Sequence, residues 1–375
     1  MATLSQKLKL FRGLFTGDIA YNAPFYVTID ITSRCNLRCL GCPYHSPLIR
    51  KQADVDMANR DISYSVFEAL CYDLKMMGTN QIIICGEGEP FLHPHLFDLI
   101  SAAKKIGLQI ILYTNGTFLD DVNIIHLIES RVDVLKVSLW ASSNDEYKKN
   151  YPVDNTVNLE KVIDGLKLLA HSKATKKSKF PFVNVCHPIN AYNFKNIDEM
   201  IDLVFRTGCD AISFTPLHTH KGKFSDFSLS VSDEKSLILS LTKAKKRLDS
   251  SSVGHNFKQI LLRFKIGEAV WEKLPCYIGW LHASVKMNGT VFPCCRHIVP
   301  MGNLNEKNFY EIWNDAPFRS FRQASRTREG LTSISQNSYC GFCGYVGDNV
   351  LVHRLFKWFS PFRSTKIKEN LCSEV

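Results

Sequence analysis

The chain has 375 residues, of which 45% are hydrophobic and 22% charged, so it can form a large core and is neither disordered nor fibrous. No apolar run is long enough for a secretory signal or a membrane span, so we expect a cytoplasmic protein whose thirteen cysteines are reduced. The net charge of +10 comes from scattered Lys and Arg, and it fits an anionic partner as well as simple solubility.

A short extension, residues 1–23, precedes a long alternation of β-rich runs and helical patterns that ends near residue 250. The β-rich runs are 24–32, 81–86, 108–116, 133–140, 182–187 and 211–218. Strands alternating with amphipathic helices predict a parallel sheet covered by helices, in an α/β fold. Right-handed crossovers would curl this sheet into a partial (β/α)6 TIM-type barrel over residues 24–250.

Polar motifs follow the first four β-rich runs. Cys35 to Cys42 follow the first, Gly86 to Pro90 the second and Thr114-Asn115-Gly116 the third, while Ser138 lies late in the fourth. In barrels of this kind the chemistry takes place at the carboxyl ends of the strands. The sequence therefore predicts an active site at this end of the barrel.

The first motif reads TSRCNLRCLGCPYH and places Cys35, Cys39 and Cys42 within eight residues. Three thiolates can hold three corners of a [4Fe–4S] cluster and leave the fourth iron open for another ligand. The alternative is a structural zinc ion, which takes four N or S ligands and would need His45 or a distant residue. An open iron at a barrel mouth explains three cysteines better.

This pattern resembles the radical S-adenosylmethionine (radical SAM) superfamily over residues 24–220. Gly88-Glu89-Pro90 resembles its Gly-Gly-Glu-Pro motif, Thr114-Asn115-Gly116 is typical of its third strand, and Ser138 lies where the family has a polar residue. The resemblance implies that Cys35, Cys39 and Cys42 bind a [4Fe–4S] cluster. It also implies a set of SAM-binding residues: Gly41, Tyr44, Gly88, Glu89, Pro90, Asn115 and Ser138.

Two positions depart from the family pattern. The residue before the third cysteine is often aromatic in the family, whereas here it is Gly41, with Tyr44 nearby. Glu87 replaces the first glycine of the Gly-Gly-Glu-Pro motif. Its carboxylate is expected to face solvent, with the substrate as the alternative.

The resemblance also implies the chemistry. Family enzymes accept one electron from a donor such as flavodoxin or ferredoxin and cleave SAM reductively at the cluster. The resulting 5′-deoxyadenosyl radical abstracts hydrogen from a substrate C–H bond. The cofactors supply this chemistry, and the barrel orients them and excludes water.

After a predicted linker at 249–256, cysteines return in residues 251–348, at Cys276, Cys294, Cys295, Cys340 and Cys343. The segment VKMNGTVFPC predicts a hairpin with a type I′ turn at Asn288-Gly289. This region resembles a SPASM or twitch domain.

The resemblance implies one auxiliary [4Fe–4S] cluster on Cys276, Cys294, Cys340 and Cys343. Cys295 could replace Cys294, although the four-residue spacing from Gly289 favours Cys294. Taken alone, four cysteines also fit a zinc ribbon.

The other cysteines divide into two groups. Cys71 and Cys209 are expected in the core, and Cys372 in the tail has no expected role. Cys85 and Cys186 lie near strand ends, where a thiol could donate hydrogen to a substrate radical or simply pack in the core. Four further polar residues near strand ends could line the substrate cavity or its rim: His187, Asn190, Thr215 and His218.

Residues 349–375 predict a last helix and a basic tail. Leu355, Phe356 and Phe359 are expected to pack on the body of the protein. The alternative is peripheral contact between the tail and an anionic membrane.

We expect oxidation, dehydrogenation or epimerisation of an anionic small molecule or sugar. The alternative is a maturase that crosslinks or epimerises a peptide, or oxidises a protein residue to formylglycine; only about twenty residues precede the first strand, which argues against a peptide-recognition domain there. A non-enzymatic zinc-binding protein is the alternative of another class. No nucleic-acid partner is expected, because no motif of that kind is present.

Overall fold

The predicted α/β alternation is confirmed. The computed structural model describes residues 4–48, 61–152, 158–217, 227–266, 274–336 and 343–356. Each of the six predicted strands pairs in parallel with the next one along the chain. They are β1 (Tyr26–Asp30), β2 (Gln81–Cys85), β3 (Gln109–Thr114), β4 (Val134–Ser138), β5 (Phe182–Ile189) and β6 (Ala211–Pro216).

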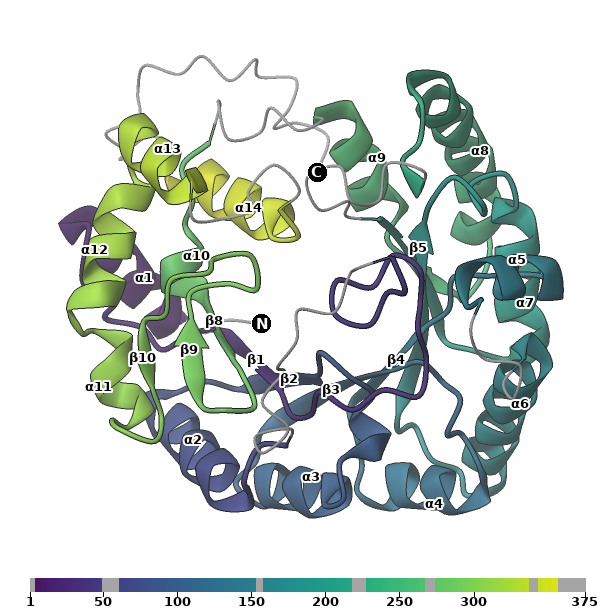
Figure 1. Cartoon of the computed structure of the whole chain (residues 1–375), viewed down its shortest axis with the longest axis horizontal. Helices are drawn as coiled ribbons and strands as arrows, with labels where there is room; N and C mark the ends of the chain where they lie inside the picture. The colour runs from purple at the N-terminus through teal and green to yellow at the C-terminus, as the bar shows by residue number, and fades with distance from the viewer. Residues whose placement is uncertain are drawn as a thin grey trace.

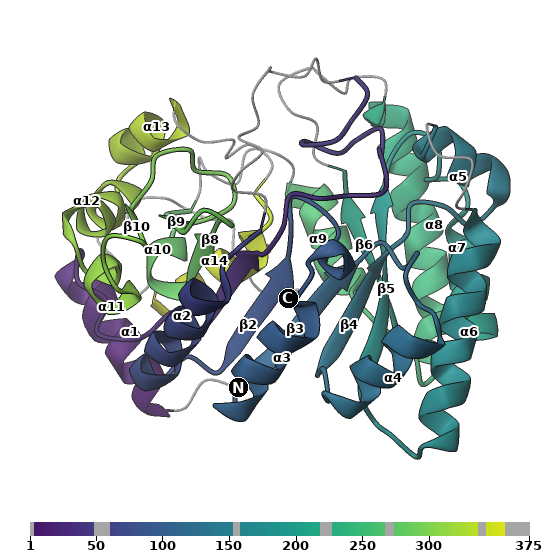
Figure 2. The same ribbon diagram turned by 60° about the horizontal axis from the view of Figure 1, so that its bottom comes forward.

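The helices between these strands lie around the outside of the curved sheet (Figures 1 and 2). Side-chain N-caps begin four of them, for example Ser63 and Asp120. Gly78 ends the helix between β1 and β2 in the left-handed conformation that favours glycine. The outer helices are α2 (Tyr64–Met77), α3 (Leu96–Lys105), α4 (Asp121–Glu129), α6 (Leu159–Thr175), α7 (Ile197–Thr207) and α8 (Val231–Asp249). Two helices that the periodicity did not predict are α1 (Leu4–Thr16) and α5 (Asn144–Asn150).

The two faces of the sheet differ in burial. Residues that point toward the helices, such as Ile29, Leu112 and Leu135, are fully buried, and each contributes about 1.5–3 kcal/mol to folding. Their neighbours along the strands point to the concave face and stay half-buried, as in the alternation of β2 and β4. The concave face therefore carries polar side chains that solvent can reach.

The second cysteine region extends the same sheet. Strand β8 (His282–Val285) pairs in parallel with β1, and β9 (Thr290–Phe292) and β10 (Gly302–Asn303) continue it in antiparallel order. At the other edge, β7 (Gly254–His255) pairs with β6. Part of the predicted linker at 249–256 therefore forms a short strand at the sheet edge.

The hairpin between β8 and β9 is confirmed, but its predicted turn type is wrong. Gly289 has φ +81, but Asn288 does not have a positive φ. Among the described non-glycine residues, positive φ values occur at Arg131 and Lys177 alone. A type I′ turn needs positive φ at both central residues, so Asn288 does not form one. Instead, Gly289 N–H donates to Lys286 O at 2.8 Å and closes a longer loop.

The remaining helices enclose the second region. A buried guanidinium, Arg322, donates to the carbonyls of Gly279 and Trp313 and thereby joins three of these helices. The helices are α9 (Phe257–Ile266), α10 (Ile278–Leu281), α11 (Phe309–Trp313), α12 (Ala316–Ser325), α13 (Arg328–Gln336) and α14 (Val346–Phe356).

The last helix, α14, meets only part of its prediction. Phe356 is buried against Phe11, with the ring centroids 5.9 Å apart, but Leu355 is 55% exposed. Phe359 and the basic tail lie outside the described residues. No helix among the described residues is both long and apolar enough to cross a lipid bilayer.

Candidate active site

The three-cysteine loop follows β1 and lies across one end of the strands (Figure 2). Cys35, Cys39 and Cys42 are half-buried, and Cys42 Sγ accepts the N–H groups of Tyr44 at 3.4 Å and His45 at 3.3 Å. Burial raises the pKa of all three thiols. Thiolates in such a place need nearby positive charge, which iron supplies, and backbone donors of this kind stabilise cluster ligands.

The loop fits a cluster through its position and its donors. Within the described ranges, no three Cys, His, Asp or Glu side chains are gathered tightly enough to hold a single metal ion. The fit of the three cysteines therefore rests on their burial, on the N–H donors to Cys42 and on their place at the carboxyl end of β1.

The segment Gly86 to Pro90 packs directly on the cysteine loop. Gly88 N–H donates to Thr32 O at 3.0 Å, and Glu89 N–H donates to Arg34 O at 2.6 Å. A Cβ atom on Gly88 would lie 2.0 Å from Arg34 O. Glycine is required here because two backbones are in contact.

Glu89 joins the ends of β2 and β3. Its side chain is 2% exposed and accepts hydrogen bonds from Thr114 Oγ1 at 2.8 Å and from Asn115 N at 2.7 Å. Burial raises the pKa of Glu89 to about 7, against the opposing effect of these donors. Pro90 begins the short 3-10 helix η1 (Pro90–Leu92).

Asn36 is a site residue that the sequence analysis missed. Its Oδ1 accepts from Asn115 Nδ2 at 2.8 Å, and its Nδ2 donates to Thr117 Oγ1 at 2.9 Å. The loops after β1, β2 and β3 are thus hydrogen-bonded into one unit. The only sequence signal was the position of Asn36 directly after Cys35.

Trp140 supplies an aromatic ring beside Gly41. A Cβ atom on Gly41 would lie 2.8 Å from the Trp140 ring, and Trp140 Nε1 donates to Ser138 Oγ at 3.2 Å. An aromatic ring from the segment after β4 therefore lies beside position 41, where the family often has an aromatic residue. Trp140 was expected in the strand and had no predicted role.

Lys286, from the loop after β8, forms ion pairs with two carboxylates. Its Nζ lies 2.6 Å from Asp30 Oδ2 and 2.9 Å from Glu87 Oε1, and 5.4 Å above the Tyr44 ring. Burial opposes the charge of Lys286, but these neighbours hold its pKa above the usual value. The expectation that Glu87 faces solvent or substrate is therefore wrong, because its carboxylate pairs with a lysine of the second region.

The concave faces of β4, β5 and β6 carry a different set of polar groups. Lys136 Nζ donates to Tyr113 OH at 3.0 Å. Ser213 Oγ lies 3.0 Å from both Asn184 Oδ1 and Cys186 Sγ. Of these residues, Cys186 alone was predicted from the sequence. Polar residues two apart in an apolar strand lie on the same face of the sheet, and this pattern could have indicated the others.

The two candidate hydrogen-donor thiols lie at different places on the sheet. Cys85 Sγ donates to Asp30 Oδ1 at 3.1 Å, beside Lys286. Cys186 is 8% exposed and pairs in register with Ser138. Burial raises the pKa of both thiols, so both are protonated at neutral pH.

His187 and Asn190 do not line a cavity, so that expectation is wrong. His187 is fully buried against Phe214, and Asn190 is fully buried with its Nδ2 donating to Asn150 Oδ1 at 2.9 Å. Thr215 is exposed, and His218 lies outside the described residues.

Cys71 and Cys209 are buried, which confirms their predicted place in the core. Cys372 lies outside the described residues.

Three cysteines of the second set, Cys294, Cys295 and Cys343, lie near Tyr345. Tyr345 N–H donates to Cys343 Sγ at 3.2 Å, and burial together with Cys295 and Cys294 raises the pKa of the Tyr345 hydroxyl. Cys294 and Cys343 are buried and Cys276 is half-buried, whereas Cys295 is exposed. Cys340 lies outside the described residues.

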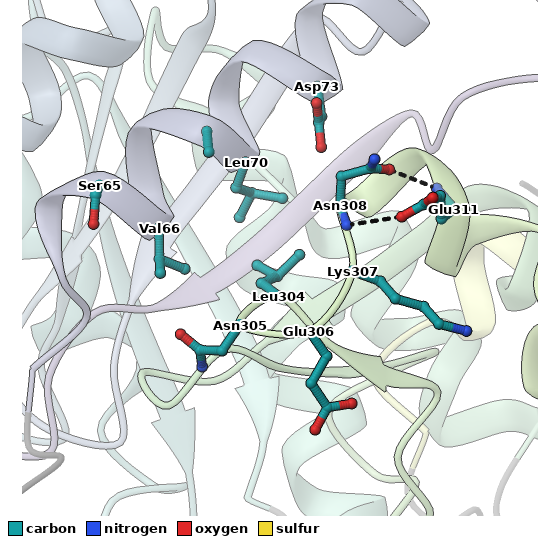
Figure 3. A pocket seen from close by; sticks show the side chains of 11 residues that line it. Ser65, Val66, Leu70, Asp73, Leu304, Asn305, Glu306, Lys307, Asn308 and Glu311 are labelled. Atoms are coloured by element: carbon teal, nitrogen blue, oxygen red, sulfur yellow. Dashed lines mark hydrogen bonds between the residues drawn. The ribbon is translucent and has the colours of Figure 1, made fainter.

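A surface groove of about 510 Å3 lies between α2 and the segment 304–308 (Figure 3). Asp73 accepts the N–H of Phe309 at 2.9 Å, and Asn308 and Glu311 cap α11 reciprocally. None of the predicted site residues lines this groove. Its polar groups hold the second region against the barrel.

Two family models match the chain. The radical SAM superfamily model matches residues 29–204, and the SPASM model, described as an iron–sulfur cluster-binding domain, matches residues 276–344.

Curated relatives match most of the chain. An AdoMet-dependent heme synthase of Methanosarcina barkeri is 24% identical over 86% of this chain and 89% of its own length. A tungsten-containing aldehyde ferredoxin oxidoreductase cofactor-modifying protein of Pyrococcus furiosus is 25% identical over 84% and 89%.

Solved structures share the fold. Streptococcus suis SuiB bound to its precursor peptide SuiA has a TM-score of 0.66 at 15% identity, covering 92% of this chain and 76% of that one. The native anSMEcpe structure with bound AdoMet has a TM-score of 0.62 at 18% identity, covering 81% and 84%.

Proposed function

We propose that this chain, which belongs to the radical SAM superfamily and carries a SPASM iron–sulfur cluster-binding domain, is an enzyme that removes a hydrogen atom from a substrate C–H bond at the mouth of its barrel. The observation that carries this proposal is the hydrogen-bonded unit formed by the loops after β1, β2 and β3. In it, Glu89 and Asn36 connect the cysteine loop to the two motifs that follow.

The cofactors of this family are [4Fe–4S] clusters and SAM. Cys35, Cys39 and Cys42 hold the cluster at which SAM binds in this proposal. Reduced by a donor such as flavodoxin or ferredoxin, the bound pair supplies a 5′-deoxyadenosyl radical. The residues around it bind the SAM molecule, fix its orientation and exclude water.

Glu89 and its neighbours bind the methionine end of SAM. Glu89 Oε2 accepts a hydrogen bond from Asn115 N, and a carboxylate oxygen can accept two, so it can also accept from an ammonium group. Gly88 and Pro90 hold the backbone close to the cluster loop. Asn115 and Ser138 give polar contacts at the strand ends.

The adenosine end of SAM lies toward the other side of the cysteine loop. Gly41 offers its backbone there, Trp140 offers an aromatic ring beside it, and Tyr44 offers a second ring from the same loop. Aromatic faces of this kind bind a purine by stacking.

Cys276, Cys294, Cys340 and Cys343 hold one auxiliary [4Fe–4S] cluster in this proposal. The burial of Cys294 and the exposure of Cys295 favour Cys294 as the ligand. A cluster with four cysteines can accept one electron from a substrate radical, which turns hydrogen removal into a net oxidation. A zinc ion at the same four thiols would not accept that electron.

A thiol provides the alternative outcome, in which a hydrogen atom is returned to the substrate radical. Cys186 is better placed than Cys85 for this role, because Cys186 lies in register with Ser138 at the end of β4, whereas Cys85 donates its hydrogen to Asp30 beside Lys286. Epimerisation in D2O would then label the product carbon with deuterium. Full turnover and labelling by a Cys186→Ala variant would exclude Cys186.

The substrate that we propose is an anionic small molecule or sugar, which is oxidised, dehydrogenated or epimerised. The basic net charge supports an anionic substrate. A peptide or protein maturase is the alternative, and the curated relatives are named for different reactions.

The test is reductive SAM cleavage by the anaerobically reconstituted protein with dithionite or flavodoxin. We expect 5′-deoxyadenosine and methionine from the wild type and none from a Cys39→Ala variant. Phosphorylated sugars, nucleotide sugars and synthetic peptides are then compared as stimulants of this cleavage. Absence of 5′-deoxyadenosine from the fully loaded wild type would refute the proposal.

A further inference from the structure

The concave face of the barrel carries two lysines with opposite surroundings. Lys286 lies between two carboxylates, at 2.6 and 2.9 Å. Lys136 lies on β4, and its hydrogen-bond partner is the neutral hydroxyl of Tyr113 at 3.0 Å. In the part of the chain that the structure describes, no carboxylate forms an ion pair with Lys136.

The surroundings of Lys136 are polar but uncharged. Asn184 is its register partner on β5, and Ser213 and Cys186 lie next to Asn184. The carboxylate of Asp30, on the same face of the sheet, is already bound by Lys286 and Cys85. A half-buried ammonium group without a counter-charge is costly, so this site favours an anion that comes from outside the protein.

The position of Lys136 relates this charge to the active site. Lys136 and Ser138 are two residues apart on β4, so their side chains share the concave face. Ser138 is at the carboxyl end of the strand, which is the end where the loops after β1, β2 and β3 form the proposed SAM site. A substrate bound to Lys136 through one end would therefore extend toward these loops.

We propose that Lys136 binds a carboxylate or phosphate group of the substrate and so determines substrate specificity. Tyr113 and Asn184 complete the site with a hydroxyl and an amide. This inference rests on the proposed function, since it takes the concave face of the barrel as the place where the substrate binds.

The experiment uses Cys186 as a reporter of the charge beside it. The anaerobic holoenzyme is treated with iodoacetate, which is anionic, and with iodoacetamide, which is neutral. Peptide mass spectrometry gives the two alkylation rates at Cys186, and their ratio cancels any change in the thiol pKa. A Ser213→Cys variant provides a second reporter thiol at the same site, for use if Cys186 reacts with neither reagent.

We expect the iodoacetate-to-iodoacetamide ratio to fall about fourfold or more in Lys136→Met, from the Coulomb attraction over about 5 Å in water. Lys136→Arg should keep the wild-type ratio. Lys104→Met, which removes a lysine that is paired with Asp133 elsewhere in the barrel, is the matched control and should also keep it. An equal ratio in wild type and Lys136→Met would overturn the proposal.

Competition then identifies the anion. Inorganic phosphate and succinate are added separately to the iodoacetate reaction, with succinamide as the neutral match. Slower alkylation with phosphate indicates a phosphorylated substrate, and slower alkylation with succinate a carboxylate, in both cases only when Lys136 is present. No effect of either anion would also overturn the proposal. Because alkylation does not depend on SAM cleavage, this result is independent of the test of the proposed function.

Discussion

The two halves of the concave face differ in how their charges are balanced. On the side of β1 and β2, Lys286 neutralises Asp30 and Glu87, and Glu89 is bound by donors from β3. On the side of β4 to β6, the described residues place hydroxyl, amide and thiol groups around Lys136 and no ion-paired carboxylate. The first half resembles a finished site for a cofactor, in which the carboxylates of Asp30, Glu87 and Glu89 have partners, and the second half leaves a charge for a ligand.

This difference explains which residues tolerate change. In the first half, removing one member leaves another buried group without its partner, which is expensive. In the second half, removing Lys136 leaves no buried carboxylate behind. Substitutions in the first half should therefore reduce stability and cofactor binding, and those in the second half should reduce substrate binding.

The largest effect is expected from Gly88→Ala. The new Cβ would lie 2.0 Å from Arg34 O, so the segment Gly86 to Pro90 must move away from the cysteine loop. A displacement of about 1 Å at a reacting centre can reduce a rate about a hundredfold, and we expect at least that loss in 5′-deoxyadenosine formation. Gly347→Ala, where a Cβ meets no atom within 4 Å and where, as at Gly88, φ is not in the left-handed region, controls for the general effect of replacing a glycine. Wild-type activity in Gly88→Ala would contradict the close backbone contact.

The next effect separates Cys294 from Cys295. Cys294→Ala should lose about four irons per chain, because the auxiliary cluster loses a ligand, while Cys295→Ala should lose none. Iron and sulfide analysis of the two purified variants measures this directly. Iron loss in Cys295→Ala alone would reverse the assignment.

Lys286→Met tests the charge balance itself. Breaking a buried ion pair by removing one partner typically costs about 3–5 kcal/mol, and Lys286 has two partners. We expect the free energy of unfolding to fall by about 3 kcal/mol in denaturant titrations. Lys136→Met is the matched comparison and should cost less than about 1 kcal/mol, since no carboxylate loses its cation.

A second substitution sharpens this measurement. Adding Glu87→Gln to Lys286→Met should recover part of the lost stability, because one uncompensated carboxylate is removed with the lysine. Equal losses in Lys286→Met and Lys136→Met would mean that the two halves of the face do not differ.

The last effect, which is spread over several pH units, is a pH dependence that comes from Glu89. Its pKa in the folded chain is raised from 4.5 to about 7 by burial. A raised carboxyl pKa stabilises the folded chain below the unfolded pKa, and this stabilisation is lost as the pH rises through about 7. At about 1.4 kcal/mol per pKa unit, the loss between pH 4.5 and pH 8 is up to about 3 kcal/mol.

The comparison for this prediction is Glu89→Gln, which cannot ionise. Denaturant titrations of the cluster-free wild type and variant across this pH range give the free energy of unfolding at each pH. The two proteins are compared by how steeply this free energy changes with pH. Parallel pH profiles would show that Glu89 does not titrate in this range.

Much of the fold could be predicted from the sequence, because the alternation of β-rich runs and amphipathic helices is strong over residues 24–250. The pairing of β8 with β1 could not be predicted, since His282 to Val285 carry no signal that names a partner strand. The turn at Asn288-Gly289 was predicted with the wrong conformation, because the same two residues also fit a longer loop.

The candidate site was predicted less evenly. The spacing of Cys35, Cys39 and Cys42 suggested a cluster site, and the resemblance to the radical SAM superfamily added Glu89, since both motifs consist of residues that are close in sequence. The Lys286–Glu87 pair could not be found, because it joins residues almost two hundred positions apart. Lys136 was overlooked because a single lysine in an apolar strand has the same pattern as a lysine on a solvated face.

The central claim is that the chain holds an open iron–sulfur cluster and an auxiliary one. The most direct test is the iron, sulfide and zinc content of the anaerobically purified protein, beside a Cys35/Cys39/Cys42→Ala variant. We predict about eight irons per chain in the wild type and about four in the variant. Zinc without iron in both proteins would contradict the account.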